Sequence, residues 1–453
     1  MYLVAGLGVT GQSVLRYFEA QGEPCLAFDT RDNLDISTLE TTFTKTPFAL
    51  GELPKSWLKK FDTLVLSPGI AQSESWVVAL KEQGKQVIGD IELFARTVSA
   101  PVIAITGSNG KSTVTTMTGM ALQTAGYQVG VGGNIGETVL DLLLDENTYD
   151  VYVLELSSFQ LETTYSLTSQ ASTVLNISED HMDRYPSMTE YIQAKMNVFS
   201  NTELAVLPEG LSEQGVFHPV SISRFGLSEN VIQSERDFGI LTKGGGDKFL
   251  GVGKQPIIAV SEMLLQGKHH QLNALAMMAL CQSFQVNAEH FKQVVRTFGG
   301  LPHRTQLLGT FEGVTWINDS KGTNVGATLT AIETLGEQVT GKLILLLGGV
   351  SKDADFSDLL PAVQRFCRHT IVLGRDKESI SAHLIDMPHT LVETLEEAVS
   401  LAKQKAQQGD CVLFSPACAS FDQFSNYLQR GEFFMQWVNE LYLCDERVAS
   451  KAC

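Results

Sequence analysis

The chain has 453 residues, 43% of them hydrophobic, which suits two or three compact domains better than one core. Acidic residues outnumber basic ones by 51 to 33, so a formal net charge of −18 argues against binding to nucleic acid or to anionic membranes. The seven cysteines lack C-x-x-C spacing, and no apolar run approaches the ~18 residues of a membrane span. We therefore expect three domains, a reducing cytoplasm, no disulfide framework and no membrane insertion.

The first predicted strand, YLVAG at residues 2–6, runs directly into a G-x-G-x-x-G turn formed by Gly6, Gly8 and Gly11. A helical pattern follows, and Asp29 ends the next strand pattern at the spacing of a dinucleotide-binding fingerprint. These residues by themselves favour NAD(P) or FAD, with another nucleotide diphosphate or a structural turn as alternatives. A second strand-end turn, LSPGI at residues 66–70, either closes over the same crevice or is an ordinary turn.

The next distinctive stretch is AITGSNGKSTVTT, residues 104–116, between a predicted strand and an amphipathic helix. It resembles a Walker loop that lacks two residues, because only Ser108 and Asn109 separate Gly107 from Gly110. The glycines would leave N–H groups free for phosphate oxygens, while Lys111 supplies positive charge. We predict an ATP site with a shortened loop, and a chance Gly-Lys pair is the alternative.

Magnesium bound with ATP needs further oxygen ligands from nearby strand ends. Glu155 ends the predicted strand VYVLE, and His181 and Asp183 follow a further strand in NISEDHMDRYP. A lone loop histidine is often only polar surface, so a functional and a structural interpretation of His181 both remain. Two nucleotide-phosphate sites in one chain favour an enzyme that uses ATP to activate a group on a nucleotide-linked substrate.

Short apolar runs that end in Gly, Asp or Ser recur along the chain, including TLVLSPG, TVLNIS, LILLLGG, TIVLG and CVLFSP. Such runs predict buried parallel strands of βαβ units and hence an α/β fold. Breaks in the pattern place the domains at residues 1–92, 93–300 and 301–453. We expect hairpins attached to the middle domain over residues 203–260, where helical periodicity is weak.

Motifs in all three domains together resemble the Mur ligases: GSNGKST, GGNIG, LELSSFQLE, NISEDHMDRY, LPHR, WINDSKGTN and SPACASFDQF. The resemblance implies a Rossmann-like N-terminal domain that binds UDP, a P-loop ATPase-like central domain and a Rossmann-like C-terminal domain. It implies a cytoplasmic, monomeric ligase of peptidoglycan precursor synthesis. The expected reaction joins D-glutamate to UDP-N-acetylmuramoyl-L-alanine with ATP, through an acyl phosphate and a tetrahedral intermediate.

The resemblance also implies residue roles in three binding sites. The expected contacts to the UDP-linked substrate are Gly8, Val9, Thr10, Asp29, Thr30, Arg31, Ser67, Pro68, Gly69, Asn134 and His181. The expected contacts to ATP are Gly107, Ser108, Asn109, Gly110, Lys111, Ser112, Thr113, Asn273, Arg304 and Asp319. The expected contacts to D-glutamate are Thr323, Lys352, Ser420, Phe421 and Tyr427.

The catalytic residues that the resemblance implies are Lys111, Glu155, His181, Lys195 and Arg304. Two Mg²⁺ ions would be held by Ser112, Glu155, His181 and Lys195, the last as a carbamate. The alternatives are a folylpolyglutamate synthetase or another Mur ligase, an NAD-dependent oxidoreductase with a regulatory ATP site, and a nucleotide sensor without catalysis.

Overall fold

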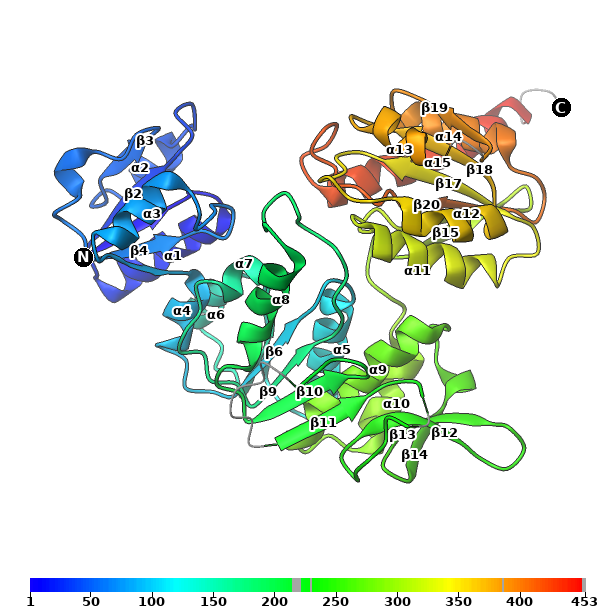
Figure 1. Cartoon of the computed structure of the whole chain (residues 1–453), viewed down its shortest axis with the longest axis horizontal. Helices are drawn as coiled ribbons and strands as arrows, with labels where there is room; N and C mark the ends of the chain where they lie inside the picture. The colour runs from blue at the N-terminus through cyan, green and yellow to red at the C-terminus, as the bar shows by residue number, and fades with distance from the viewer. Residues whose placement is uncertain (214–220, 229, 385–386, 450–453) are drawn as a thin grey trace. The chain divides into compact units, whose positions relative to one another are not determined.

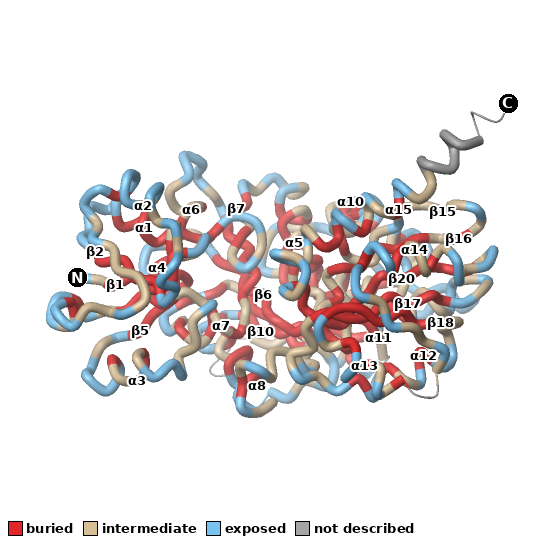
Figure 2. The backbone as a smooth tube through the Cα atoms, turned by 90° about the horizontal axis from the view of Figure 1, so that it is seen from above, coloured by how far each residue is buried: buried red, intermediate tan, exposed pale blue. Residues whose placement is uncertain are grey.

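The computed structural model describes residues 1–213, 221–228, 230–384 and 387–449. These residues form three sheets, of five, nine and six strands, with helices packed on them (Figure 1). Most neighbouring strands are parallel, which confirms the predicted α/β class. Figure 2 shows that β6 (Val102–Thr106) and β17 (Leu343–Gly348) are buried, as their uninterrupted apolar sequences predict.

The N-terminal sheet has the order β3-β2-β1-β4-β5 and is parallel throughout. Alternate residues of β1 face opposite ways: Val4 shares a core with Val14, and Leu3 shares another with Val77. Its elements are β1 (Tyr2–Ala5), α1 (Val9–Gln21), β2 (Cys25–Asp29), α2 (Ser37–Thr42), β3 (Phe48–Leu50), η1 (Lys55–Trp57), β4 (Thr63–Leu66), α3 (Ser75–Glu82), β5 (Gln86–Ile88) and α4 (Asp90–Ala95).

The central sheet has the order β14-β13-β12-β11-β10-β9-β6-β8-β7. Its strands are β6, β7 (Val129–Gly133), β8 (Val151–Glu155), β9 (Ala171–Val174), β10 (Leu204–Pro208), β11 (Ser221–Phe225), β12 (Phe238–Thr242), β13 (Lys248–Val252) and β14 (Gln255–Ala259). The helices are α5 (Lys111–Thr124), α6 (Val139–Leu144), α7 (Ser158–Leu161), α8 (Met188–Met196), η2 (Asn197–Phe199), η3 (Val260–Glu262), α9 (Lys268–Leu280), η4 (Cys281–Ser283) and α10 (Ala288–Thr297).

The expected hairpins are present only in part of residues 203–260. Strands β12, β13 and β14 pair antiparallel, as predicted. The prediction is wrong for β10 and β11, which continue the parallel sheet, because the apolar run LAVLP of β10 is buried between two neighbouring strands.

The N-terminal and central sheets belong to one compact unit, residues 1–177, 189–266 and 270–298. A continuous cluster of buried side chains joins them and includes Phe18, Phe94 and Leu140. Arg16 and Asp141 add a bidentate ion pair, with both N···O distances 2.7 Å. These contacts fix the elements that carry the sites described below.

The second unit, residues 178–188, 267–269 and 299–453, contains the C-terminal sheet in the order β15-β16-β20-β17-β18-β19. Helices α11 and α12 cover one face of β17 through Leu343, Leu345 and Leu347, and α14 and α15 cover the other face, where Ile344 and Leu346 lie (Figure 1). The remaining elements are β15 (Gln306–Phe311), β16 (Val314–Asn318), α11 (Val325–Gly336), η5 (Ser357–Leu359), α12 (Leu360–Phe366), β18 (Cys367–Leu373), α13 (Lys377–His383), β19 (His389–Leu391), α14 (Leu395–Lys405), β20 (Cys411–Phe414) and α15 (Tyr427–Ala449).

Residues 178–188 and 267–269 therefore group with the C-terminal sheet although they interrupt the central domain in sequence. Within the described ranges, no helix has the length and apolar character to cross a bilayer. The five cysteines whose side chains are described are all free thiols; Cys444 and Cys453 lie outside that set.

Candidate active site

The glycine turn after β1 is closely packed against the turn after β4. Gly6 has φ +89°, and a Cβ atom built on Gly11 would lie 1.8 Å from the Gly6 carbonyl oxygen. Ser67 Oγ donates to the same oxygen at 2.8 Å. Because β2, β1 and β4 are neighbours in the sheet, the predicted UDP contacts at all three carboxyl ends come together.

Replacing Gly11 with alanine should lower the free energy of unfolding by about 1–3 kcal/mol, because the new methyl group overlaps a backbone carbonyl that cannot move freely. Gly69→Ala is the matched control in the neighbouring turn, since a Cβ atom there meets nothing within 4 Å. Urea denaturation of both variants measures the difference. Equal stability of the two variants would contradict the packing argument.

Asp29 connects β2 to the glycine turn. Its carboxylate accepts hydrogen bonds from Leu7 N at 2.7 Å and from Arg31 Nε and Nη2, both at 2.8 Å. Burial favours the neutral acid, but these bonds outweigh burial and lower the pKa of Asp29 to about 2. Asp29 therefore stays ionised at neutral pH and holds Arg31 at the mouth of the turn.

The phosphate loop lies between β6 and α5, as predicted. Gly107 and Gly110 have φ of +147° and +83°, conformations that disfavour other residues. The structure differs in one respect: the N–H groups of Ser108 and Asn109 are bonded to Asn176 O and Oδ1, at 3.0 and 2.8 Å. The start of α5, whose N-cap residue is Gly110, is the other part of the loop where backbone N–H groups point along the helix axis towards an anion.

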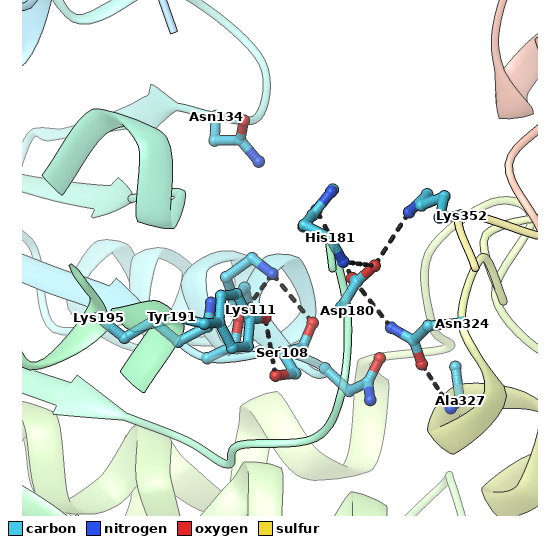
Figure 3. A network of polar contacts seen from close by, with 12 residues as sticks. Ser108, Lys111, Asn134, Asp180, His181, Tyr191, Lys195, Asn324, Ala327 and Lys352 are labelled. Carbon is cyan, nitrogen blue, oxygen red and sulfur yellow. Dashed lines mark hydrogen bonds and ion pairs between the residues drawn. The ribbon is translucent and has the colours of Figure 1, made fainter. Parts of the chain in front are cut away.

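Two lysines converge on one carbonyl of this loop (Figure 3). Lys111 Nζ donates to Gly107 O at 2.8 Å and to Ser108 O at 3.0 Å, and Lys195 Nζ donates to Gly107 O at 2.9 Å. Lys195 is only 2% exposed and lies over the ring of Tyr191, whose hydroxyl is 3.0 Å from Ser108 Oγ. Lys111, at the start of α5, places positive charge at a helix N-terminus, which suits the predicted phosphate contact in a chain that is strongly acidic overall.

The side chains of Ser112, Glu155 and Asn134 meet beside the loop. Ser112 Oγ donates to Glu155 Oε2 at 2.5 Å, and Asn134 Nδ2 donates to Glu155 Oε1 at 2.8 Å. Glu155 is buried at the end of β8, which is adjacent to β6. A hydroxyl and a carboxylate are the hard oxygen ligands that Mg²⁺ prefers, so this pair fits the predicted metal role.

Two further predicted ATP contacts in this unit lie at the loop. Thr113 is buried in the first turn of α5. The Asn273 Oδ1 atom of α9 lies 2.8 Å from the position of a Cβ built on Gly110, so α9 closes directly over the loop. Thr113 and Asn273 are thus within the loop's immediate surroundings.

A small pocket in the C-terminal unit brings together two predicted D-glutamate contacts, Thr323 and Lys352. Asp180, His181 and Asn324 also line it. Non-glycine residues in the left-handed region concentrate here: His181, Lys352 and Ala417 have φ of 59°, 54° and 55°. Such backbone strain is typical of functional sites.

His181 belongs to this C-terminal pocket, with Nε2 3.6 Å from Asp180 Oδ2. Across the described residues, no group of three or more His, Cys, Asp and Glu side chains is arranged to hold a metal ion. The proposed role of His181 as a metal ligand therefore stays a prediction.

Arg304 and Asp319 lie at the start of the C-terminal unit. Asp319 accepts hydrogen bonds from Thr305 N at 2.9 Å and Ser415 Oγ at 2.6 Å. Burial raises the pKa of Asp319 to about 6, although Ser415, Thr305 and the charge of Arg304 oppose the shift. Asp319 therefore fixes the backbone beside Arg304, whose neighbours His303 and Thr305 have φ of 60° and 46°.

The other predicted D-glutamate contacts do not line the pocket. Ser420 is buried, its carbonyl accepting Phe424 N at 2.9 Å, whereas Phe421 is 73% exposed. The ring of Tyr427 lies 4.3 Å from Lys321 Nζ. Buried Arg430 links the segment that contains Ser320 to the segment that contains Cys418. Its Nη2 donates to Ser320 O at 2.7 Å, and its Nη1 donates to Cys418 O at 3.0 Å.

Sequence reasoning did not identify Asn176, Asp180 or Arg430. Asn176 and Asp180 lie within a quoted motif, NISEDHMDRY, but nothing in the spacing shows which loop or lysine they contact. Arg430 lies in a helical pattern, where an arginine ordinarily predicts an exposed surface.

Profiles of Mur ligase domains match most of the chain: the MurD-like N-terminal domain at residues 1–89, the middle domain at 105–281 and the glutamate ligase domain at 303–418. The chain is 57% identical over 440 residues to UDP-N-acetylmuramoylalanine–D-glutamate ligase of Hydrogenovibrio crunogenus, covering 97% of this chain and 98% of that protein. It is 42% identical over 443 residues to the protein of the same name from Alcanivorax borkumensis, with coverage of 97% and 98%.

Solved structures agree at the level of the fold. UDP-N-acetylmuramate–alanine ligase MurC of Thermotoga maritima superposes with a TM-score of 0.59 at 16% identity, covering 96% of this chain and 98% of that one. Sequence identity to the first relative extends through all three domains that the profiles match. The chain is therefore a member of the Mur ligase family.

Proposed function

We propose that this protein is the ATP-dependent ligase that adds D-glutamate to UDP-N-acetylmuramoyl-L-alanine in peptidoglycan precursor synthesis. The observation that carries the proposal is the 57% identity, over 97% of the chain, to a relative that bears this activity in its name. ATP and a UDP-linked precursor as substrates support action in the cytoplasm, and we propose that the enzyme acts as a monomer.

The chemistry explains why such a ligase needs ATP. A carboxylate is a poor electrophile, so one of its oxygens first attacks the γ-phosphorus of ATP, forming a C–O–P link and expelling ADP. The D-glutamate nitrogen then attacks the acyl carbon and gives a tetrahedral intermediate. Collapse breaks the C–O bond and releases phosphate, the amine losing a proton, which leaves an amide.

The phosphate loop supports the first step. Lys111, the first residue of α5, would bind the β- and γ-phosphates and stabilise the charge that shifts onto the leaving ADP. Ser112 and Glu155 would hold a Mg²⁺ ion, which when bound would neutralise phosphate charge. Arg304 is the proposed guanidinium donor to the phosphoryl oxygens, where its planar fork suits two acceptors.

The glycine turn of the N-terminal sheet supports the UDP site. The exposed start of α1, at Gly8 and Val9, offers backbone donors for a diphosphate. Arg31, held by Asp29, adds a positive charge beside it. We propose Asn134 as a contact to the substrate or to the phosphoryl group, because its amide is already fixed by Glu155.

Lys195 is proposed to carry a carbamate that serves as a metal ligand. His181 is proposed as a further metal ligand. Carbamylation adds CO2 to the neutral amine, forming an N–C bond and releasing one proton. Native mass spectrometry should therefore show the added mass of one CO2, whose two oxygens would be available to a metal ion. Because Lys195 Nζ lies beside Gly107 O, the carbamate oxygens would lie near the phosphate loop. Lys254→Met, altering an exposed lysine of the same unit, should keep the added mass, whereas Lys195→Met should lose it. An unmodified wild-type mass at neutral pH with bicarbonate present would contradict this role.

The test of the proposed function is phosphate release by the purified protein with ATP, Mg²⁺ and UDP-N-acetylmuramoyl-L-alanine. We expect release with D-glutamate and little with L-glutamate, L-lysine or meso-diaminopimelate. Release with another amino acid would indicate a different Mur ligase. Intact ATP under all conditions would overturn the proposal and favour the oxidoreductase or sensor alternatives.

A further inference from the structure

The C-terminal pocket already holds a carboxylate, and that carboxylate comes from the protein itself (Figure 3). Asp180 Oδ1 is 2.9 Å from Lys352 Nζ and accepts His181 N at 3.0 Å, while Oδ2 accepts Asn324 Nδ2 at 3.2 Å. The side chains of Lys352 and Asp180 are only 14% and 10% exposed. An ammonium and an amide thus converge on a single carboxylate in a largely closed setting.

Lys352 is held in place by its own loop and not only by Asp180. The preceding residue, Ser351, donates from N and Oγ to Asp376 Oδ2, at 2.7 and 2.8 Å. Lys352 and Asp353 both adopt left-handed backbone conformations, with φ of 54° and 56°, which persist only when the surroundings enforce them. The ammonium group therefore has a support that remains when Asp180 departs.

Asn324 is likewise preset. Its Oδ1 accepts Ala327 N at 2.8 Å and so caps the N-terminus of α11. Because the oxygen is committed to the helix, the Nδ2 donor is the end of the amide that faces the pocket. The site is thus built to receive a carboxylate oxygen whichever molecule supplies it.

Asp180, by contrast, lies in a segment that precedes α8 and forms no helix or strand between residues 178 and 187. The segment interrupts the other unit in sequence and is grouped with the C-terminal unit. Releasing Asp180 would rearrange turns and leave the sheet core unchanged. Asp180 is therefore the exchangeable member of the trio.

We propose that Asp180 is an internal competitor for the amino-acid substrate: its carboxylate occupies Lys352 and Asn324 until the side-chain carboxylate of D-glutamate displaces it. This inference rests on the proposed function. It makes Asp180 a residue that sets the affinity for an acidic side chain, because only such a side chain can replace the Asp180 carboxylate on Lys352. An amino acid with a neutral side chain cannot take over the ion pair and must leave it intact.

The test is the KM for D-glutamate in Asp180→Asn, with ATP and the UDP-linked substrate saturating. Loss of the competing charge should lower this KM about three- to tenfold, the scale of one partly buried ion pair. Because D-glutamine leaves the Asp180–Lys352 pair in place, its kcat/KM should change less than about twofold, so the preference for D-glutamate over D-glutamine should rise. Asp358→Asn is the matched control, since it makes the same change at an exposed residue of η5 that does not line the pocket. Its KM for D-glutamate should change less than about twofold.

Because Asp180 adjoins His181, a proposed metal ligand, the substitution needs a second readout that does not depend on turnover. Equilibrium dialysis of labelled D-glutamate with ADP and the UDP-linked substrate measures binding without catalysis and should show the same tighter affinity. An unchanged or higher KM and dissociation constant in Asp180→Asn would overturn the inference, while an active wild type leaves the proposed function standing. A wild type without D-glutamate-dependent phosphate release would overturn the proposed function instead.

Discussion

Replacing Lys111 with methionine should lower kcat about 10²- to 10³-fold, the loss expected when one fixed donor to a developing negative charge is removed. Methionine keeps the length of the aliphatic stem and removes the ammonium group. In the structure that ammonium bonds the Gly107 and Ser108 carbonyls, 2.8 and 3.0 Å away, so it lies at the centre of the loop. Phosphate release under saturating substrates measures the effect.

Lys254→Met is the control, because Lys254 is exposed in the turn between β13 and β14 of the same unit. It removes the same charge from the unit at a distance from the loop and should leave kcat within about twofold, as an exposed charge contributes little. If Lys111→Met and Lys254→Met lowered kcat equally, the loss would come from the total charge of the unit and not from the position of Lys111. If Lys111→Met retained normal kcat, the phosphate loop would not be the catalytic ATP site.

Local patterns predicted the elements that carry this loop. The run VIAIT became β6, and GSNGKS gave the loop and the start of α5, because a buried apolar strand followed by glycines allows few other conformations. The same reasoning correctly placed Gly6 and Gly11, whose tight approach tolerates no side chain. These features depend on residues that are close together in the sequence, so a single sequence is enough to predict them.

Contacts between distant segments could not be predicted in this way. Asn176 accepts hydrogen bonds from two N–H groups of the phosphate loop. Asp180 accepts a hydrogen bond from Lys352, which lies 172 positions away in the sequence. Each depends on which strand neighbours which and on how a turn is oriented, and neither property has a local signature. The parallel strands β10 and β11 escaped prediction for a related reason: their pairing is decided by the sheet and not by their own composition.

Arg430→Met should destabilise the C-terminal unit by about 2–4 kcal/mol, since two buried carbonyl groups lose their donor and each such loss costs about 1–3 kcal/mol. Those acceptors are Ser320 O and Cys418 O, and Arg430 itself is 2% exposed. Burial lowers the pKa of Arg430 to about 10, so the guanidinium remains charged at neutral pH and its removal relieves part of the desolvation cost. Methionine fills a similar volume, so the loss of stability reflects the missing hydrogen bonds and not a large cavity.

Hydrogen exchange of β17 and β20 measures this opening free energy within the C-terminal unit, separately from the other sheets. Arg365→Met, which removes an exposed guanidinium from α12, should change it by less than about 0.5 kcal/mol. Because Arg430 joins the backbone near Thr323 to that near Ser420, the KM for D-glutamate should rise in parallel with the loss of protection. Normal hydrogen-exchange protection in Arg430→Met would contradict this prediction. It would mean that water replaces the hydrogen bonds of Arg430 to Ser320 and Cys418 at little cost, and that the core cluster with Phe414 and Phe434 is enough to hold the two segments together.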